Sequence, residues 1–402
     1  MNIEHRKINK TVRFTGPDGS VLSDRIIHIK QKNHSFLFGC GAFDFIPYVN
    51  EDKEGYKQLT DSWLDLFNYA TLPFYWGNYE KKEGSPARDS LMKTAKFLKD
   101  KGVTVKGHPL CWHTACADWL MDYDNETIMK KQLARIHREV TEFKGVIDMW
   151  DVINEVVIMP IFDKYDNAIT RICKEKGRVG LIKEVFTAAK ESNPDATLLL
   201  NDFNTSIDYE ILIDGCLNAG VPISAIGIQS HQHQGYWGRE KLEKVLERFS
   251  SFGLPIHFTE NTLISGEIMP AHIVDLNDWQ VETWPTTPEG EERQAGQIAE
   301  MYSILFSHPL VEAVTTWDYK DGAWLNAPSG YVRKDFSLKP SYTRLQKLIK
   351  NEWWTDTEVK TDENGFAKIN AFKGEYCLDC EDLKTDVRFV DDSEMNVDMM
   401  PA

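Results

Sequence analysis

The stretch Val146-Ile-Asp-Met-Trp-Asp-Val-Ile-Asn-Glu155 decides the fold, because it is a short apolar run that ends in two polar residues. Its length and β-branched content are typical of a buried strand. A second run of this kind, Leu254-Pro-Ile-His-Phe-Thr-Glu260, also ends in a glutamate. A carboxyl group at the end of a buried strand is poorly solvated, so its neighbours can tune its pKa. We expect Glu155 and Glu260 to meet in the folded protein.

Short apolar runs recur between residues 36 and 318 with helical patterns between them. The candidate strands are 36–40, 66–70, 103–107, 146–150, 197–200, 225–229, 255–259 and 311–315. The clearest helical stretches are 90–101, 126–143, 179–191, 211–219, 240–252 and 291–306. Eight strands separated by helices predict an α/β fold, the (β/α)8 or TIM barrel. A doubly wound sheet would typically carry a glycine-rich phosphate loop after its first strand, and this sequence has none there.

The two ends of the chain differ from its middle. Residues 1–33 include a hairpin pattern that turns at Pro17-Asp-Gly19, and residues 355–390 include another at Thr361-Asp-Glu-Asn-Gly365. Each segment is too short to bury a sheet alone. We therefore expect them to form one small β-subdomain beside a catalytic barrel at 34–354. We expect the acidic tail at 391–402 to be disordered.

Composition excludes several classes of partner. The net charge of −16 repels nucleic acid and anionic membrane surfaces, and no apolar run approaches the roughly 20 residues that span a bilayer. The seven cysteines are scattered, and Cys377-Leu-Asp-Cys380 has no second pair, so we expect buried thiols and neither a metal nor a cofactor. The sequence begins without an apolar leader, which indicates a cytoplasmic protein. A removed leader would look the same, so a periplasmic or secreted location is the alternative. The oligomeric state stays open.

Polar and aromatic residues follow the proposed strands. The carboxyl ends of barrel strands meet at one face, where barrel enzymes place their active groups. A structural protein has no reason to concentrate such residues there. They are His108, Trp112, His113, Asn154, Glu155, Asn201, Asp202, Asn204, Gln229, His231, His233, Glu260, Trp317 and Trp324.

These segments resemble glycoside hydrolase family 10, the retaining β-1,4-xylanase family with catalytic glutamates on strands four and seven. The resemblance runs from about residue 36 to residue 345, and its order and spacing make it specific. Its anchors are Gly107-His108-Pro-Leu-Cys-Trp112-His113, Trp150-Asp-Val-Ile-Asn154-Glu155, Asn201-Asp-Phe-Asn204, Gly227-Ile-Gln229-Ser-His231, Thr259-Glu260, Thr316-Trp317-Asp and Leu338-Lys-Pro-Ser-Tyr342.

The resemblance implies cleavage of a β-linked oligo- or polysaccharide by double displacement, with Glu155 as general acid and base and Glu260 as nucleophile. Glu155 would then need a raised pKa, from burial and from the charge of Glu260. The remaining implied roles concern the sugar. Asn154 would bind the 2-hydroxyl, His231 would orient Glu260, His113 and Gln229 would contact the sugar, Trp317 and Trp324 would enclose it, and Asn204 would line the cleft.

Departures from the family pattern put the sugar in doubt. In place of the usual Glu-Asn-x-x-Lys-Trp after strand two, this chain has Thr71-Leu-Pro-Phe-Tyr-Trp76-Gly-Asn-Tyr79-Glu80, which replaces charged contacts with an aromatic wall that includes Trp76. Thr262 stands where the family has an aspartate that would pair with the strand-six histidine. We expect xylan or xylo-oligosaccharides as substrate, with another β-glycan or a glycoside as the alternative.

Two other functions are compatible with parts of the sequence. A metal-dependent barrel hydrolase could use His231-Gln-His233 with His108, His113 and Glu260, although such barrels usually place His-x-His on the first strand. A non-catalytic glycan-binding barrel would fit the altered residues around the site. A pure binder, however, needs no paired acid and nucleophile.

Overall fold

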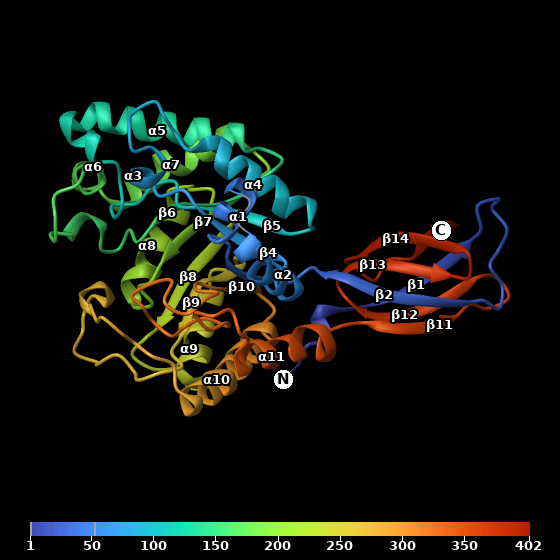
Figure 1. The fold of residues 1–402 in the computed structure, drawn as a ribbon. Helices are drawn as coiled ribbons and strands as arrows, with labels where there is room; N and C mark the ends of the chain where they lie inside the picture. Colours follow the sequence, from blue (N-terminus) through green and yellow to red (C-terminus); the bar gives the residue numbers. More distant parts are fainter. Residues whose placement is uncertain (1, 52–53) are drawn as a thin grey trace.

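The computed structural model describes residues 2–51 and 54–402, and its main body is a closed barrel of parallel strands (Figure 1). The strand order around the barrel is β10-β3-β4-β5-β6-β7-β8-β9. The predicted (β/α)8 barrel is therefore confirmed. The strands are β3 (Leu37–Gly41), β4 (Tyr69–Pro73), β5 (Thr104–His108), β6 (Met149–Asn154), β7 (Thr197–Asp202), β8 (Ala225–Gln232), β9 (Ile256–Leu263) and β10 (Val311–Thr316).

Helices surround the barrel and cover its outer face. Each of the longer ones turns one apolar stripe inward, as α9 does with Leu242, Val245, Leu246 and Phe249. The helices are α1 (Phe45–Glu51), α2 (Lys57–Leu66), α3 (Trp76–Tyr79), α4 (Arg88–Asp100), α5 (Asn125–Glu142), α6 (Ala168–Lys176), α7 (Arg178–Ser192), α8 (Ile207–Asn218), α9 (Gly238–Ser250), α10 (Pro288–Phe306) and α11 (Pro340–Lys347). Within the described ranges, no helix is both long and apolar enough to cross a bilayer.

Several strand boundaries differ from the predicted ones. The second strand begins at Tyr69 rather than at Leu66, because Leu66 still belongs to α2. β8 and β9 extend further than predicted, since Gln229 and His231 of β8 still pair with Glu260 and Thr262 of β9. Polar side chains that we placed beyond these strands therefore lie within them, where paired backbone holds them rigidly.

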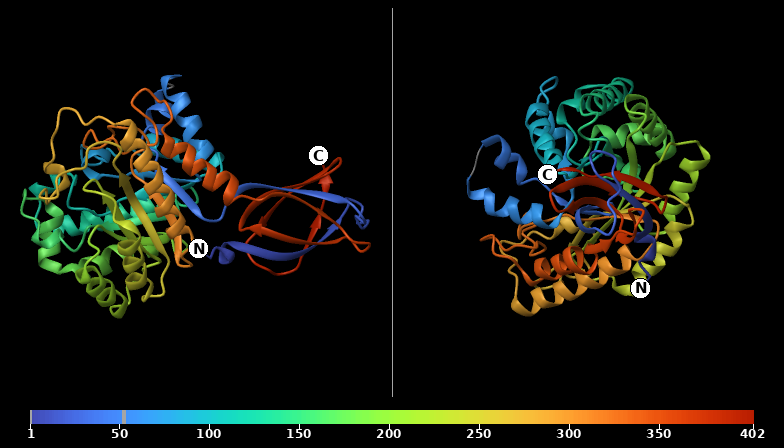
Figure 2. Two further views of the ribbon diagram at one scale, coloured as in Figure 1. Left: turned by 90° about the horizontal axis from the view of Figure 1, so that it is seen from below. Right: turned by 90° about the vertical axis from the view of Figure 1, so that its right-hand side faces the viewer.

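The terminal segments form a two-sheet sandwich beside the barrel (Figure 2). One sheet has the order β12-β1-β15 and the other has the order β11-β2-β13-β14-β16. Both sheets bury one face in a common core that includes Val12, Phe14, Ile29, Tyr376 and Leu378. The strands are β1 (Lys7–Thr15), β2 (Ile26–His34), β11 (Asp356–Lys360), β12 (Phe366–Phe372), β13 (Gly374–Cys380), β14 (Leu383–Phe389), β15 (Met395–Asp398) and β16 (Met400–Pro401).

The predicted hairpins pair only beside their turns, as in the antiparallel bridge between Thr15 and Val21, and the strands that flank each turn do not pair with each other. β1 and β2 flank the turn at Pro17-Asp-Gly19, but β1 pairs with β12 whereas β2 pairs with β11 and β13. β11 and β12, which flank the second turn, also enter different sheets. Each chain reversal therefore crosses between the sheets. A two-stranded hairpin would have left its apolar face in water, and the crossing buries that face.

The acidic tail is ordered, so the prediction that it is disordered is wrong. β15 pairs in parallel with β1, and β16 pairs with β14. Val397 and Met399 alternate with acidic or exposed residues and are almost fully buried in the sandwich core. This short alternating pattern buries two apolar side chains in the sandwich core, which the acidic composition of the tail does not indicate.

Arg6 joins the sandwich to the barrel at the amino ends of the barrel strands. Its guanidinium group donates hydrogen bonds to the carbonyl oxygens of Phe306 (2.8 Å), His308 (2.7 Å) and Val311 (2.6 Å). It also lies 4.6 Å from the centre of the Phe36 ring. Val311 begins β10, so this joint lies at the barrel face opposite the one where the strands end.

Candidate active site

Glu155 and Glu260 lie at the carboxyl ends of β6 and β9. Glu155 directly follows β6 and has a φ of +59°, a left-handed backbone conformation that is uncommon for residues with a side chain. Its backbone N–H donates to the carbonyl oxygen of Asn201 at 2.9 Å, which fixes the turn. Strained conformations of this type cluster at functional sites. Glu260 lies within β9 and is 4% exposed.

A chain of amide side chains connects the two carboxyl groups. Asn201 Nδ2 donates to Glu260 Oε1 at 2.9 Å and to Asn154 Oδ1 at 2.8 Å. Gln229 Nε2 donates to the same Asn154 oxygen at 3.0 Å and to Glu155 Oε1 at 3.2 Å. Asn154, Gln229 and both glutamates therefore converge on one network. The sequence alone assigns no role to Asn201, because its neighbourhood depends on the order of the strands in the barrel.

The surroundings of Glu155 favour its protonated form. Burial raises the pKa of this carboxyl group, the negative charge of Glu260 raises it further, and together they bring it to about 8. Hydrogen bonds from Gln229 and from Trp112 Nε1, which lies 2.9 Å from Oε2, offset part of this effect. At neutral pH the group therefore holds a proton that it can donate.

The surroundings of Glu260 favour its ionised form. Burial acts against the charge, but His108, His231 and the buried Lys106 outweigh burial, so the pKa of Glu260 is lowered. His231 Nε2 lies 3.1 Å from Oε2, and His108 Nδ1 lies 3.9 Å from Oε1. Lys106 is paired with Asp151 at 2.6 Å beneath the site. The half-buried Glu155 and the buried Glu260 thus have opposite protonation states, as an acid and a nucleophile require.

Aromatic rings surround the glutamates. Trp317 lies 5.2 Å from the His108 ring, and Trp324 lies 4.6 Å from the His231 ring, measured between ring centres. Tyr75 lies 5.7 Å from both His108 and Trp112, and both glutamates raise its pKa after burial does. The sequence run 74–76 gave the signal for an aromatic wall, but only the backbone decides that Tyr75 is the residue that faces the site.

Three predicted residues lie elsewhere or serve the scaffold. Trp76 is 5% exposed and donates its indole N–H to Glu80 Oε2 at 3.1 Å, so it belongs to the packing of the outer helices. The side chain of Asn204 accepts a hydrogen bond from the Ser206 backbone N–H at 2.8 Å and stabilises a turn. His113 is 1% exposed beneath Phe162 at 4.5 Å, and burial lowers its pKa to about 4.

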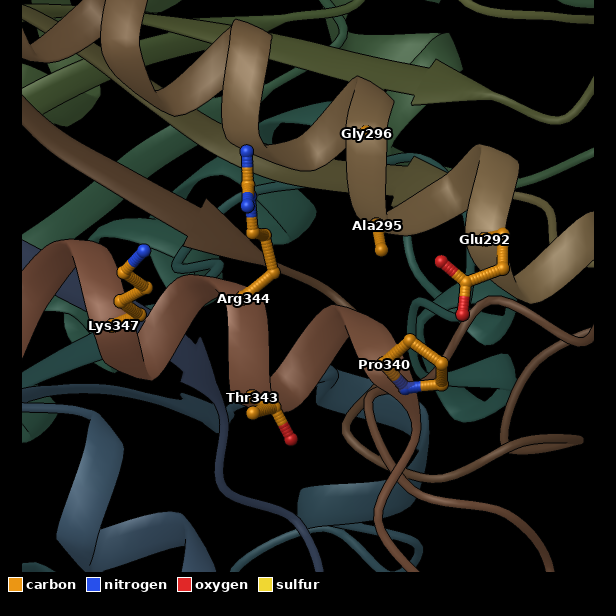
Figure 3. A pocket seen from close by; sticks show the side chains of 7 residues that line it. All are labelled: Glu292, Ala295, Gly296, Pro340, Thr343, Arg344 and Lys347. Carbon is orange, nitrogen blue, oxygen red and sulfur yellow. The ribbon is translucent and has the colours of Figure 1, made fainter.

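Two cavities accompany the barrel. A groove of about 410 Å³ lies between α10 and α11 of the outer ring, lined by Glu292, Ala295, Gly296, Pro340, Thr343, Arg344 and Lys347 (Figure 3). A smaller cavity of about 200 Å³ lies between the loops that follow β5 and β6, and Cys116, Asp118 and Tyr165 are among the residues that line it. The smaller cavity is close to the catalytic face, because Glu155 begins the β6–α6 loop.

Within residues 2–51 and 54–402, no three His, Cys, Asp or Glu side chains are arranged to hold a metal ion. The Nδ1 atoms of His231 and His233 both face the hydroxyl group of Thr262, at 3.2 Å each. The proposed His-x-His ligand pair is therefore directed at a hydroxyl group.

Fold and site together define a class, the (β/α)8 barrels with two glutamates of opposite protonation on strands four and seven. The profile of glycosyl hydrolase family 10 matches residues 67–348. The chain belongs to glycosyl hydrolase family 10. The predicted resemblance is thereby confirmed at the level of the family.

Two curated relatives are similar to the chain. The chain is 27% identical over 306 residues to an endo-1,4-beta-xylanase/feruloyl esterase of Xylanibacter ruminicola. The matched region covers 68% of this chain and 40% of that protein. It is 24% identical over 384 residues to the anti-sigma-I factor RsgI6 of Acetivibrio thermocellus. That matched region covers 93% of this chain and 45% of that protein. The chain thus spans less than half the length of these relatives.

Solved structures share the fold. A family 10 structure from Paenibacillus barcinonensis has a TM-score of 0.65 at 21% identity, covering 79% of this chain and 95% of that one. Xylanase 10B of Thermotoga petrophila, solved in complex with xylobiose, has a TM-score of 0.64 at 20% identity over the same shares. At this identity the likeness concerns the fold.

Proposed function

We propose that this protein is a retaining glycoside hydrolase that cleaves β-1,4-linked glycans, with xylan and xylo-oligosaccharides as its first expected substrates. The observation that carries the proposal is the opposite protonation of Glu155 and Glu260 within one hydrogen-bond network. Such a pair supplies a proton donor and a nucleophile at the same pH. Membership of family 10 and the xylanases among the relatives support the choice of glycan.

In the first step Glu155 transfers its proton to the glycosidic oxygen while a Glu260 oxygen attacks the anomeric carbon. The bond from that carbon to the leaving oxygen breaks, and an ester between Glu260 and the sugar forms. Asn201 and His231 hold the Glu260 carboxylate by hydrogen bonds of 2.9 and 3.1 Å. Asn154 lies between the two glutamates and can meet the sugar 2-hydroxyl.

In the second step Glu155, now ionised, takes a proton from water. The water oxygen bonds to the anomeric carbon, and the ester bond to Glu260 breaks. The sugar regains its original configuration because each step inverts the carbon. Trp317 and Trp324, whose rings both lie against His231, would cover the sugar during this step.

One observation favours a second substrate class. Tyr75 faces the site, and it comes from the segment that lacks the Glu, Asn and Lys of the family pattern, so a stacking surface is present where charged hydrogen-bonding groups are lost. A pocket with fewer charged contacts discriminates sugar hydroxyls less. Another β-glycan or an aryl glycoside is therefore the alternative substrate. A product screen over xylans, glucans, mannans and aryl glycosides separates these substrates.

The decisive experiment is Glu260→Ala with an activated aryl β-glycoside. We expect a loss of turnover of at least about 10³-fold, because the nucleophile is absent. Added azide should restore part of the rate, and it should yield the α-glycosyl azide, since a single displacement inverts the carbon. Full activity in Glu260→Ala would refute the assignment.

Glu155→Ala provides the matched comparison. Good leaving groups need little protonation, so this variant should form the glycosyl-enzyme readily and then hydrolyse it slowly. An initial burst of the aryl alcohol is the expected signature. Saccharide binding without turnover in the unmodified protein would instead support the glycan-binding alternative.

A further inference from the structure

Thr262 lies between two histidines behind the proposed nucleophile. It is paired across the strands with His231, two register positions after the pair formed by Gln229 and Glu260. Its hydroxyl oxygen lies 3.2 Å from His231 Nδ1 and 3.2 Å from His233 Nδ1. The backbone N–H of Gln232 donates to the same oxygen at 3.3 Å. Thr262 and His233 are buried, at 1% and 0% exposure.

The protons in this chain can be counted. Glu260 is ionised and can only accept, so His231 Nε2, at 3.1 Å from it, must carry a proton. The hydroxyl group has one proton for two imidazole nitrogens, so one Nδ1 atom accepts and the other donates. If His231 Nδ1 accepts, His231 is neutral. If it donates, His231 is an imidazolium ion and His233 must carry its proton on Nε2.

On the side of His231 that faces away from Glu260, the neighbours Thr262 and His233 carry no negative charge that would stabilise a positive charge on the ring. Burial lowers the pKa of His233 to about 3, so this ring is neutral, and Thr262 is neutral as well. The negative charge of Glu260 lies in front, but His108 and Lys106 on β5 already act on it, with Glu155 protonated nearby. Trp317, which follows β10, and Trp324 from the same loop flank the rings.

We propose that Thr262 is a positioning residue, which keeps His231 a neutral imidazole with its proton on Nε2 and so aims a neutral donor at Glu260. The chain then runs from His233 Nδ1–H to the Thr262 oxygen, from the Thr262 O–H to His231 Nδ1, and from His231 Nε2–H to Glu260. This inference rests on the proposed function of Glu260 as nucleophile.

The arrangement suits both states of the proposed reaction. Glu260 loses its negative charge when it forms the ester, and an imidazolium beside it would then lose its partner in a buried site. A neutral His231 can donate a hydrogen bond first to the carboxylate and then to the ester oxygen without a change in its own charge. His231 can therefore stay in one protonation state throughout turnover.

The test reads the proton positions directly in the resting enzyme. In ¹⁵N-labelled protein at pH 7.5, ring correlations should show His231 as the neutral Nε2–H tautomer and His233 as the Nδ1–H tautomer, with His231→Gln used to assign the signals. Thr262→Ser should preserve both patterns, because it keeps the hydroxyl group. Thr262→Asp supplies a charged acceptor, so both ring nitrogens of His231 should carry a proton in that variant. Thr262→Val removes the hydroxyl group, so His231 should no longer be held in the Nε2–H tautomer.

Thr316→Val is the matched control, because Thr316 is a buried threonine at a strand end whose hydroxyl bonds to the Asn261 carbonyl oxygen at 3.1 Å. It should leave the His231 signals unchanged. An imidazolium at His231 in the unmodified protein, or a Thr262→Val spectrum identical to it, would overturn the proposal.

Kinetics give a second reading. On an aryl glycoside, Thr262→Val should lower kcat/KM about 10-fold and Thr262→Ser by no more than about 2-fold, the scale of one positioned hydrogen bond. Failure of the proposed function would appear as no turnover in any protein. The ring signals would still decide the placement of the protons, so the two failures are distinguishable.

Discussion

At the residue scale, two glutamates with the same intrinsic pKa are separated by what surrounds them. Glu155 is half-buried and Glu260 is buried, and this burial by itself raises the pKa of each carboxyl group. Glu260 faces His108, His231 and Lys106, whereas Glu155 faces the charge of Glu260 and an indole N–H. The neighbours of Glu260, which include the hydrogen-bond donor His231, therefore lower its pKa and assign it as the nucleophile, and Glu155 is left as the acid.

The raised pKa of Glu155 sets the alkaline side of the pH–rate profile. Glu155 must be protonated for the first step, and its pKa is about 8 in the free protein. We expect kcat/KM to fall above about pH 8 with a slope of one proton. With a glycoside whose leaving group needs no proton, kcat/KM should depend less on pH above about pH 8. A decline that begins near pH 5 would contradict the placement of the acid.

The same group makes the folded state less stable as pH rises. Its folded pKa of about 8 exceeds the ordinary 4.5, so between these values the folded state holds a proton that the unfolded state has released. The free energy of unfolding therefore falls with pH in this window. Glu155→Gln removes the effect and should be more stable than the unmodified protein at pH 8, by about 1–3 kcal/mol, with no difference at pH 4.

Denaturant unfolding at both pH values measures this difference. Glu247→Gln, on the exposed side of α9, is the control and should show no pH-dependent difference from the unmodified protein. An effect of Glu155→Gln that is equal at both pH values would show that the proton on Glu155 is not its cause.

At the element scale, the loops that follow the catalytic strands are joined across the mouth of the barrel. Lys164 of the β6–α6 loop lies 2.6 Å from Asp275 and 2.6 Å from Asp278 of the β9–α10 loop. The β9–α10 loop has a small core of its own that includes Ile264, Met269 and Trp284. The bridge thus ties a packed lobe to the loop that begins with Glu155.

We expect Lys164→Ala to loosen the lobe without unfolding the barrel. Proteolysis within 264–287 should become faster, and the melting temperature should change little, because the bridge is exposed and the small core remains. Salt should speed proteolysis of the unmodified protein more than that of the variant. Lys174→Ala on α6 is the control. Equal rates of cleavage in the two variants would show that the ion pairs of Lys164 do not restrain the lobe.

The elements themselves followed from the sequence more closely than their pairing did. Apolar periodicity identified all eight barrel strands, because burial on both faces makes parallel strands continuously apolar. The same patterns at the two ends indicated strands but not their partners. Turn residues at 17–19 specify a chain reversal, and whether it stays within one sheet depends on where the apolar faces find a core.

At the scale of the whole molecule, the sandwich attaches to the barrel at the face away from the glutamates. Arg6 is the central contact, since it bonds to three carbonyl oxygens of the barrel. Burial lowers its pKa to about 10, and the group stays charged at neutral pH. The sandwich can therefore influence stability without touching the site.

We expect Arg6→Ala to lower the free energy of unfolding by about 2–4 kcal/mol, because three partly buried carbonyl oxygens lose a charged donor. Calorimetry measures the shift in melting temperature. The kcat/KM on an aryl glycoside should not change, because the glutamates lie at the other end of the strands. Arg13→Ala, which alters an arginine on β1 beside Phe366 of the sandwich, is the control. A loss of activity equal to the loss of stability would show that the two ends are coupled.

The sequence by itself determined the barrel, the two glutamates and most of their neighbours, because strand periodicity and motif order are local properties of the chain. The tertiary structure decided which way each side chain points and which strands are adjacent. It placed Tyr75 rather than Trp76 at the site, gave Asn201 its position between the glutamates, and brought Thr262 between two histidines. Contacts of this kind depend on register between strands that are distant in sequence, and register is fixed only when the whole barrel closes.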